Sequence, residues 1–333
     1  MPAVETMRGS LDTGKLGRVL MHEHIFLVDF EYVENYRPDW NEDQAVADAI
    51  ETLDGLKDLG IDTIVDLTVL GLGRHIKRIA KVAEKTRMQI VVATGAYTFD
   101  EAPHGFEYWG PGLLADSATE PLVDCFVRDI TEGIAGTNIK AGELKCAIDA
   151  PGLKAGVERV MRAVAKTHMI TGTPISVHTA PAQETGFIVQ QVMQEEGVDL
   201  RDVIIGHCGD STDIDYLMRL ADKGSMLGMD RFGVHFVCST EDRTDTIVEL
   251  VKRGYADRLV LSHDCACWSD FFPRSEMYAQ VMPEHNYRHI SNNVVPALLE
   301  KGVGEADIDR MFIDNPRRHF EDAAARFAGR SQS

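Results

Sequence analysis

Two histidines separated by one residue, His22 and His24, are the first residues of the chain that could do chemistry together. They lie in the stretch Arg18 to Ile25, which we predict to be a β-strand. Side chains alternate along a strand, so both imidazoles point to one face while Glu23 points to the other. This spacing suits a metal ion, although such a pair is weak evidence by itself.

Four further residues of metal-binding or catalytic type stand at the ends of later predicted strands. They are Lys145, His178, His207 and Asp264. A buried histidine at one strand end is often only a structural residue. Six such residues at strand ends predict a shared metal centre, provided that the fold brings them together.

The elements that must position these residues alternate between strands and helices. The predicted strands span residues 18–25, 61–68, 88–94, 139–148, 173–178, 202–207, 225–230 and 259–264. Amphipathic helical patterns separate them, and two short helices close the chain. Eight such units favour an α/β fold, a single (β/α)8 TIM barrel, over a doubly wound sheet. We expect one domain over residues 1–333, with its core at about 15–325, and an active site at the C-terminal ends of the strands.

The composition excludes several classes of protein. The formal net charge of −19 argues against nucleic acid or an anionic membrane as a partner. No apolar run approaches about 18 residues, and the first ten residues lack the pattern of a signal peptide. The six cysteines are irregularly placed, unlike a disulfide framework. We therefore expect a cytoplasmic protein.

Four histidines, an aspartate and a lysine are too many ligands for one tetrahedral zinc ion. They suit two divalent cations about 3.5–4 Å apart, bridged by hydroxide. Lys145 fits such a centre only if carbon dioxide converts its amine into an anionic carbamate. The alternative is that Lys145 forms an ion pair with Glu143 or Asp149, and the residue types alone leave both possibilities open.

The spaced set resembles the binuclear centre of the amidohydrolase superfamily and, more narrowly, the phosphotriesterase family. The segments that carry the resemblance are Val19–His24, Gly142–Ala147, Ile205–Asp210, Gly228–Gly233, Leu261–Asp264 and Asp314–Arg318. It implies that His22, His24 and Asp264 bind the more buried metal and that His178 and His207 bind the more exposed one. Carboxylated Lys145 and a hydroxide would bridge the two ions. Zinc is expected, with cobalt, manganese or iron as other possibilities.

Two residues indicate a branch of this family. Arg231 follows the aspartate of the seventh strand, where phosphotriesterases have a histidine, and Tyr97 follows the third strand. Both features resemble the phosphotriesterase-like lactonases, which open N-acyl homoserine lactones (quorum quenching) and often hydrolyse organophosphates slowly. A homodimer is also implied. The expected substrate pocket comprises Phe26, Tyr97, Arg231, Trp268, Phe271 and Phe272. The aromatic residues after the eighth strand could instead cover the barrel or form a dimer contact.

The catalytic roles implied by this resemblance fall on three residues. Asp264 is expected to move the proton between the hydroxide and the leaving alkoxide, Tyr97 to position the lactone carbonyl, and Arg231 to orient the ring. The main alternatives are a phosphotriesterase (aryldialkylphosphatase) and a carboxylesterase or amidase on the same scaffold. A metal-binding barrel without enzymatic activity is the alternative from a different class.

Overall fold

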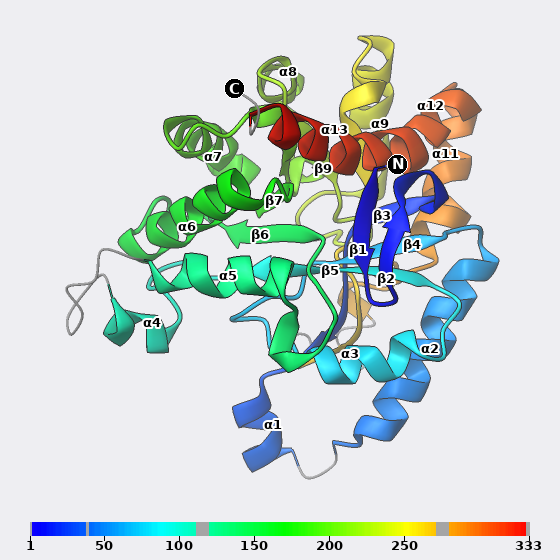
Figure 1. Ribbon diagram of the computed structural model, residues 1–333. Coiled ribbons are helices and arrows are strands. Elements are labelled where there is room, and N and C mark those ends of the chain that lie inside the picture. Colours follow the sequence, from blue (N-terminus) through cyan, green and yellow to red (C-terminus); the bar gives the residue numbers. More distant parts are fainter. Residues whose placement is uncertain (1, 38–39, 111–119, 271–279, 331–333) are drawn as a thin grey trace.

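Eight parallel strands curl into a barrel, and the helices pack around its outside (Figure 1). The computed structural model describes residues 2–37, 40–110, 120–270 and 280–330. The barrel strands are β3 (Val19–Leu27), β4 (Thr63–Asp66), β5 (Gln89–Gly95), β6 (Glu143–Ala147), β7 (Ile175–His178), β8 (Val203–Ile205), β9 (Met226–Met229) and β10 (Leu259–Leu261). All eight lie within or beside the ranges expected from the sequence, and the predicted barrel is confirmed.

The last barrel position is shared by two short strands. β10 pairs with β9, and a further strand, β11 (Ala266–Ser269), pairs with β3 on the other side. Between β10 and β11, Asp264 N–H donates to the His22 carbonyl at 3.1 Å, and His24 N–H donates to the Cys265 carbonyl at 2.8 Å. The eighth strand is therefore shorter than the predicted 259–264, and the segment that carries Asp264 interrupts it.

Helices follow the strands and cover the sheet. They are α1 (Phe30–Tyr36), α2 (Glu42–Asp58), α3 (Ile76–Ala83), α4 (His104–Trp109), α5 (Pro121–Thr131), α6 (Ala155–Thr171), α7 (Thr185–Glu195), α8 (Ile214–Asp222), α9 (Thr240–Lys252), α11 (Val295–Glu300), α12 (Glu305–Asp309) and α13 (Asn315–Arg330). Helix α2 illustrates how the sequence forms these helices. The Asn41 side chain caps its first turn, and its buried residues recur at helical spacing on one face: Ala45, Ala49, Leu53 and Leu56. None of the described helices is long and apolar enough to cross a membrane.

The hydrophobic core has two layers because alternate strand residues face opposite sides. Side chains inside the barrel form one cluster, which includes Val19, Met21, Val65, Val91, Ala93, Ile204, Met226 and Val260. Their sequence neighbours face outward into a larger cluster shared with the helices. The ionisable site lies farther along the same interior, toward the C-terminal ends of the strands.

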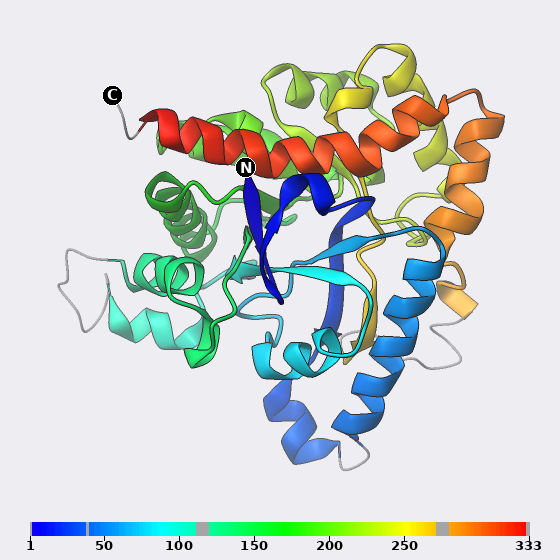
Figure 2. The same cartoon turned by 45° about the vertical axis from the view of Figure 1, so that its right-hand side comes forward.

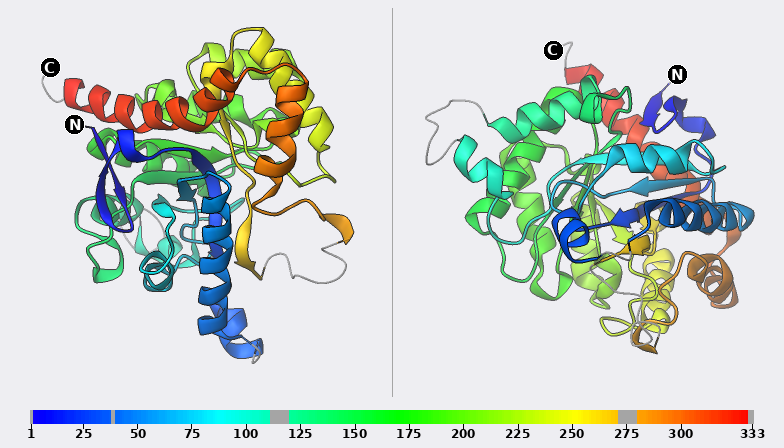
Figure 3. Two further views of the ribbon diagram at one scale, coloured as in Figure 1. Left: turned by 90° about the vertical axis from the view of Figure 1, so that its right-hand side faces the viewer. Right: turned by 90° about the horizontal axis from the view of Figure 1, so that it is seen from below.

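The opposite end of the barrel is closed by elements that the sequence patterns did not predict. A hairpin of β1 (Ala3–Thr6) and β2 (Gly9–Asp12) lies beside α13 at this end (Figure 2). Seen from below, α13 lies on the far side of the molecule (Figure 3, right). The expectation of two short closing helices is wrong, because α13 spans 16 residues. Its buried face mixes the polar Asn315 and His319 with Pro316, Phe320 and Ala323, so the apolar pattern of its first turns is weak.

Candidate active site

The six predicted ligands converge inside the barrel. Asp264 Oδ1 lies 3.4 Å from His22 Nε2 and 3.2 Å from His24 Nε2. His207 Nε2 lies 2.7 Å from His178 Nδ1, and Lys145 Nζ lies 3.3 Å from His22 Nε2. The histidines and the lysine are all buried. The strands therefore bring together all six residues, although His22, His24 and Lys145 lie within their strands rather than at the last residue.

The outer ring nitrogen of each histidine is held by an oxygen. Asp230 accepts from His22 Nδ1 at 2.8 Å through one carboxylate oxygen and from His207 Nδ1 at 2.9 Å through the other. Asp149 Oδ2 lies 2.6 Å from His178 Nε2, and Thr68 Oγ1 lies 2.8 Å from His24 Nδ1. Such outer partners fix the tautomer and orientation of metal-binding histidines. Asp230 was not predicted as a site residue, although its place at the end of a predicted strand is the same signal that identified the ligands.

These outer bonds determine where the lone pairs point. A nitrogen bonded to a carboxylate must donate its proton, so the neutral rings of His178 and His207 have unprotonated inner nitrogens. Those two nitrogens, His178 Nδ1 and His207 Nε2, face each other at 2.7 Å. Facing lone pairs repel unless a cation lies close to both. His22, His24 and Asp264 also form a compact set of possible ligands. The residues present therefore fit divalent cations bound at this place.

The titration state of the site favours cation binding. Burial lowers the pKa of His178 to about 4, and burial with the nearby Arg231 holds the pKa of His207 well below its usual value. Against the opposite effect of burial, the neighbouring histidines and Arg231 hold the pKa of Asp264 well below its usual range. At neutral pH the imidazoles of His178 and His207 are thus neutral and the Asp264 carboxylate is charged, as metal ligands must be.

The two carboxylates named as alternative partners of Lys145 are bonded elsewhere. Glu143 accepts from Ser176 Oγ at 2.8 Å and lies 3.0 Å from His319 Nε2, while Asp149 is bonded to His178. Lys145 instead points at His22, and burial lowers its pKa to about 8. The ion-pair alternative for Lys145 is therefore not the arrangement that the structure shows.

Arg231 connects Asp264 to the wall of the site. Its Nε donates to Asp264 Oδ2 at 3.2 Å, and one terminal nitrogen donates to Asp210 Oδ2 at 3.0 Å. Asp210 also pairs with the fully buried Arg243 at 2.5 Å. Arg243 in turn donates to the Val234 and Cys238 carbonyls in the loop between β9 and α9. The Asp264 carboxylate is therefore held from the side by a charged chain.

A cavity of about 490 Å³ opens above this cluster. Its volume lies within the range of small-molecule sites. Five of the six clustered residues, all but His207, form one part of its lining, together with Arg231 and Tyr97, whose hydroxyl lies 3.4 Å from His178 Nδ1. The rest is largely apolar, and its hydrophobic residues are Leu27, Leu72, Phe99, Val234, Phe236, Val237 and Met282. The cavity thus combines a charged floor with an apolar wall.

The expected pocket residues have mixed outcomes. Tyr97 and Arg231 line the cavity, as predicted. Phe26 does not line it but is buried in the outer core beside Arg78, because two consecutive residues, Ile25 and Phe26, both face outward there. Trp268 packs against Trp40 at 4.3 Å between ring centroids, away from the cavity lining. Phe271 and Phe272 lie outside the described residues. His285, which was not among the expected pocket residues, also lines the cavity.

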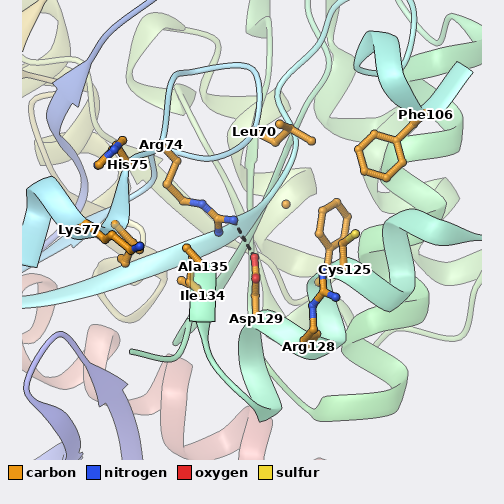
Figure 4. Close-up of a pocket in the computed structure, with 13 residues that line it drawn as sticks. Leu70, Arg74, His75, Lys77, Phe106, Cys125, Arg128, Asp129, Ile134 and Ala135 are labelled. Carbon is orange, nitrogen blue, oxygen red and sulfur yellow. Dashed lines mark hydrogen bonds and ion pairs between the residues drawn. The ribbon is translucent and has the colours of Figure 1, made fainter. Parts of the chain in front are cut away.

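A second cavity of about 480 Å³ lies outside the barrel, between the segment from Leu70 to Lys77 and helix α5 (Figure 4). Arg74 and Asp129 point toward each other there, and Arg74 donates to Asp129 Oδ2 at 2.7 Å. Thr94 Oγ1 donates to the same oxygen at 2.7 Å, and Arg74 also donates to the Ala93 carbonyl at 3.0 Å. Cys125 and the ring of Phe106 line the same space.

Comparisons with known proteins identify the relatives of this chain. Residues 2–320 match the model of the phosphotriesterase family. A phosphotriesterase homology protein of Mycobacterium tuberculosis is 52% identical over 96% of this chain and 98% of its own length. An aryldialkylphosphatase of Saccharolobus solfataricus is 34% identical over 94% of this chain and 98% of the relative.

Two solved structures resemble the whole chain. The phosphotriesterase from Mycobacterium tuberculosis superimposes with a TM-score of 0.94 at 52% identity, covering 96% of this chain and 98% of that one. A structure described as "Molecular Engineering of Organophosphate Hydrolysis Activity from a Weak Promiscuous Lactonase Template" gives a TM-score of 0.87 at 30% identity, covering 96% and 99%. The likeness therefore extends over the barrel and its site together.

Proposed function

This chain belongs to the phosphotriesterase family of binuclear metal hydrolases, and from that premise we propose that it opens lactones, chiefly N-acyl homoserine lactones. Slow hydrolysis of organophosphates is proposed as a side activity. The observation that carries the proposal is the cavity, in which Tyr97 and Arg231 stand beside the ligand cluster and an apolar wall faces it. A lactone ring at the cluster would leave its acyl chain against that wall, where burial of each CH₂ contributes about 0.8 kcal/mol.

Six residues would hold the metal centre. His22, His24 and Asp264 form one set, His178 and His207 the other, and Lys145, carboxylated on Nζ, would lie between them. Two divalent cations there, zinc in our proposal, supply Lewis-acid polarisation of the substrate and of the attacking water. Asp230, Asp149 and Thr68 keep the histidine rings turned toward the centre.

The chain's own residues then orient the substrate and move the proton. Burial raises the pKa of Tyr97, so its phenol stays protonated and can donate a hydrogen bond to the carbonyl oxygen of the ring. Asp264, held as a carboxylate, takes the proton from the attacking water as the new C–O bond forms. It gives that proton to the ring oxygen as the ester C–O bond breaks, and the product is a hydroxy acid. Arg231 keeps the Asp264 carboxylate directed into the cavity.

A second candidate function is phosphotriester hydrolysis as the main activity. It is supported by the similarity to the Saccharolobus solfataricus aryldialkylphosphatase. Against it stands Arg231, which fills the space beside Asp264 by bonding to Asp264 and Asp210 together. A carboxylesterase or amidase would need the same cluster and differs only in the leaving group.

A substrate panel separates these functions. We would compare kcat/KM for an N-decanoyl homoserine lactone, a dialkyl aryl phosphate, an aryl ester and an N-acyl amide under identical metal loading. The proposal expects the lactone to exceed each of the others by at least tenfold. A higher kcat/KM for the phosphate would make the protein a phosphotriesterase, and a stable metal-loaded chain without turnover of any substrate would favour a binding protein.

A further inference from the structure

Glu23 lies in the sequence between two proposed metal-binding histidines. Its described hydrogen bonds, however, all go to a different segment of the chain. Its buried carboxylate receives four hydrogen bonds from the segment Ser262–Cys265. Oε1 accepts from Ser262 Oγ at 2.9 Å, from His263 N–H at 2.9 Å and from His263 Nδ1 at 2.7 Å. Oε2 accepts from Cys265 N–H at 3.0 Å. One side chain therefore holds the backbone immediately before and immediately after Asp264.

The backbone of Asp264 explains why such support is needed. Its φ is +57°, in the left-handed region that residues other than glycine avoid. This conformation interrupts the strand, so the neighbouring N–H groups of His263 and Cys265 turn away from a regular ladder. Both are satisfied by Glu23, whereas Asp264 N–H bonds to the His22 carbonyl. Strained backbone persists at functional sites only where the surrounding structure over-determines it.

The same carboxylate couples this turn to the rest of the site. Ser262 Oγ, which donates to Glu23, also accepts from His22 N–H at 2.9 Å. Because His263 donates through Nδ1, its Nε2 is free to accept from Ile290 N–H at 3.1 Å. The Tyr287 hydroxyl donates to the carbonyls of His24 and Cys265. Glu23 therefore lies at the centre of a bonded network that joins β3 to the turn at Asp264.

His207 provides an internal parallel. Its φ is +62°, and its N–H donates to a carboxylate on the next strand, Asp230 Oδ1, at 2.8 Å. Among the described residues other than glycine, four have positive φ, and two of them are His207 and Asp264. Each left-handed residue is thus held by a buried carboxylate that accepts backbone N–H groups, that of His207 itself in one case and those on both sides of Asp264 in the other.

We propose that Glu23 is a positioning residue that fixes the Asp264 carboxylate for metal binding and proton transfer by clamping the backbone on both sides of it. The catalytic part of this inference rests on the proposed function, whereas the effect on Asp264 and on metal affinity does not. Glu23 itself touches neither substrate nor cluster, because its oxygens are occupied by the turn.

Glu143 offers a matched control. It is also fully buried on a barrel strand, and it also bonds a serine hydroxyl and a histidine, those of Ser176 and His319. None of its described hydrogen bonds reaches the segment 262–265. The change Glu143→Gln therefore carries the general cost of neutralising a buried carboxylate without loosening Asp264.

The test compares Glu23→Gln with Glu143→Gln. The amide that Glu23→Gln introduces would present its own N–H₂ to backbone or side-chain donors, so at least one bond of the clamp is lost. We expect Co²⁺ to bind at least tenfold more weakly to E23Q than to E143Q, and kcat for lactone opening to fall about 10- to 100-fold further. Crystal structures of both metal-free variants would show whether Asp264 leaves its left-handed conformation in E23Q alone.

Equal Co²⁺ affinity in the two variants would overturn the proposal, whatever their melting temperatures. If E23Q does not fold, Glu23→Asp carries the same comparison, because the shorter carboxylate cannot reach both His263 N–H and Cys265 N–H. If the wild-type chain opens no lactone, the proposed function fails, but the Co²⁺ titration and the crystal structures still decide the role of Glu23.

Discussion

Two cavities in the described part of this molecule have nearly the same volume and very different chemistry. The inner cavity, of about 490 Å³, ends on a cluster in which the ring nitrogens of His178 and His207 face each other at 2.7 Å. The outer cavity, of about 480 Å³, centres on Arg74 and Asp129, which neutralise each other. Volume therefore does not distinguish a reactive site from a gap between helices. The distinguishing feature is a set of polar side chains that converge on one point without pairing with one another.

The hydrogen bonds of the buried histidines and those of Asp129 also have different roles. In the inner cavity, carboxylates behind the histidines orient their rings toward a shared point. We propose that metal ions bind at this point and complete the site. In the outer cavity, Asp129 accepts from both Arg74 and Thr94, and its bonds join β5 to α5 and to the segment before α3. We therefore expect changes to the inner cavity to affect turnover and changes to the outer cavity to affect stability.

The largest effect on turnover is expected from Asp264→Asn in the inner cavity. Its matched substitution in the outer cavity is Asp129→Asn. Removing the carboxylate takes away the proposed proton carrier, which typically costs about 10²- to 10⁴-fold in rate. We expect kcat/KM for lactone opening to fall by about that factor while circular dichroism stays unchanged. Turnover within tenfold of the wild-type enzyme would contradict the role assigned to Asp264.

A second effect concerns the stability of the metal-free chain at acidic pH. The folded chain keeps His178 neutral down to a pKa of about 4, whereas an unfolded histidine takes up its proton near pH 6.5. The unfolded state thus binds more protons in this window, and the stability of the metal-free chain is lost as pH falls from 6.5 toward 4. One proton contributes at most about 1.4 kcal/mol per pH unit. Urea unfolding of wild type and His178→Gln should show a shallower pH dependence in the variant, and equal slopes would contradict this.

A smaller effect is expected at the cavity wall. Phe236 lines the inner cavity and is 66% exposed, so it is available to cover an acyl chain. Phe236→Ser should raise KM for a decanoyl lactone about fivefold, equivalent to roughly 1 kcal/mol of lost apolar burial. KM for a butanoyl lactone should change little. The control is Tyr108→Ser on α4, outside the inner cavity, and equal effects of both changes would argue against an acyl-chain wall.

The smallest effect on turnover is expected from Asp129→Asn in the outer cavity. The change weakens the pairing of a largely buried Arg74 and should lower the free energy of unfolding by about 1–3 kcal/mol. The rate per folded molecule should stay within twofold of wild type. Denaturant unfolding and lactone assays on one preparation measure both quantities. A loss of rate comparable to that of Asp264→Asn would show that the two cavities are not independent.

The sequence predicted the barrel and the six residues that converge inside it, because these depend on short-range patterns. Apolar runs define the strands, and the C-terminal ends of barrel strands necessarily face one another. The direction of Phe26 was not predictable in this way, because β3 does not keep strict alternation. Its register against β4 shifts between Leu20 and Glu23, and both Met21 and His22 face inward, so counting by twos fails along this strand.

The long-range hydrogen bonds that position the site were also beyond sequence patterns, even where the residue itself stands at a predicted strand end. Glu23 was expected only to face away from the histidine pair, and its partners lie about 240 positions later in the chain. Asp230 holds His22 from across the barrel, a contact that no local spacing records. Helix α13 escaped detection as a long helix for a similar reason, since His319 and Asn315 are buried through hydrogen bonds to distant strands and loops.

A metal titration of the chelated chain during lactone opening tests most directly whether the enzyme is a metal-dependent lactonase. Zn²⁺ or Co²⁺ would be added to the metal-free protein while the hydrolysis of N-decanoyl homoserine lactone is followed. We predict no turnover without metal and a rate that reaches its plateau at two ions per chain. Lactone opening that persists after complete chelation, or a fully loaded chain that leaves the lactone intact, would contradict a metal-dependent lactonase.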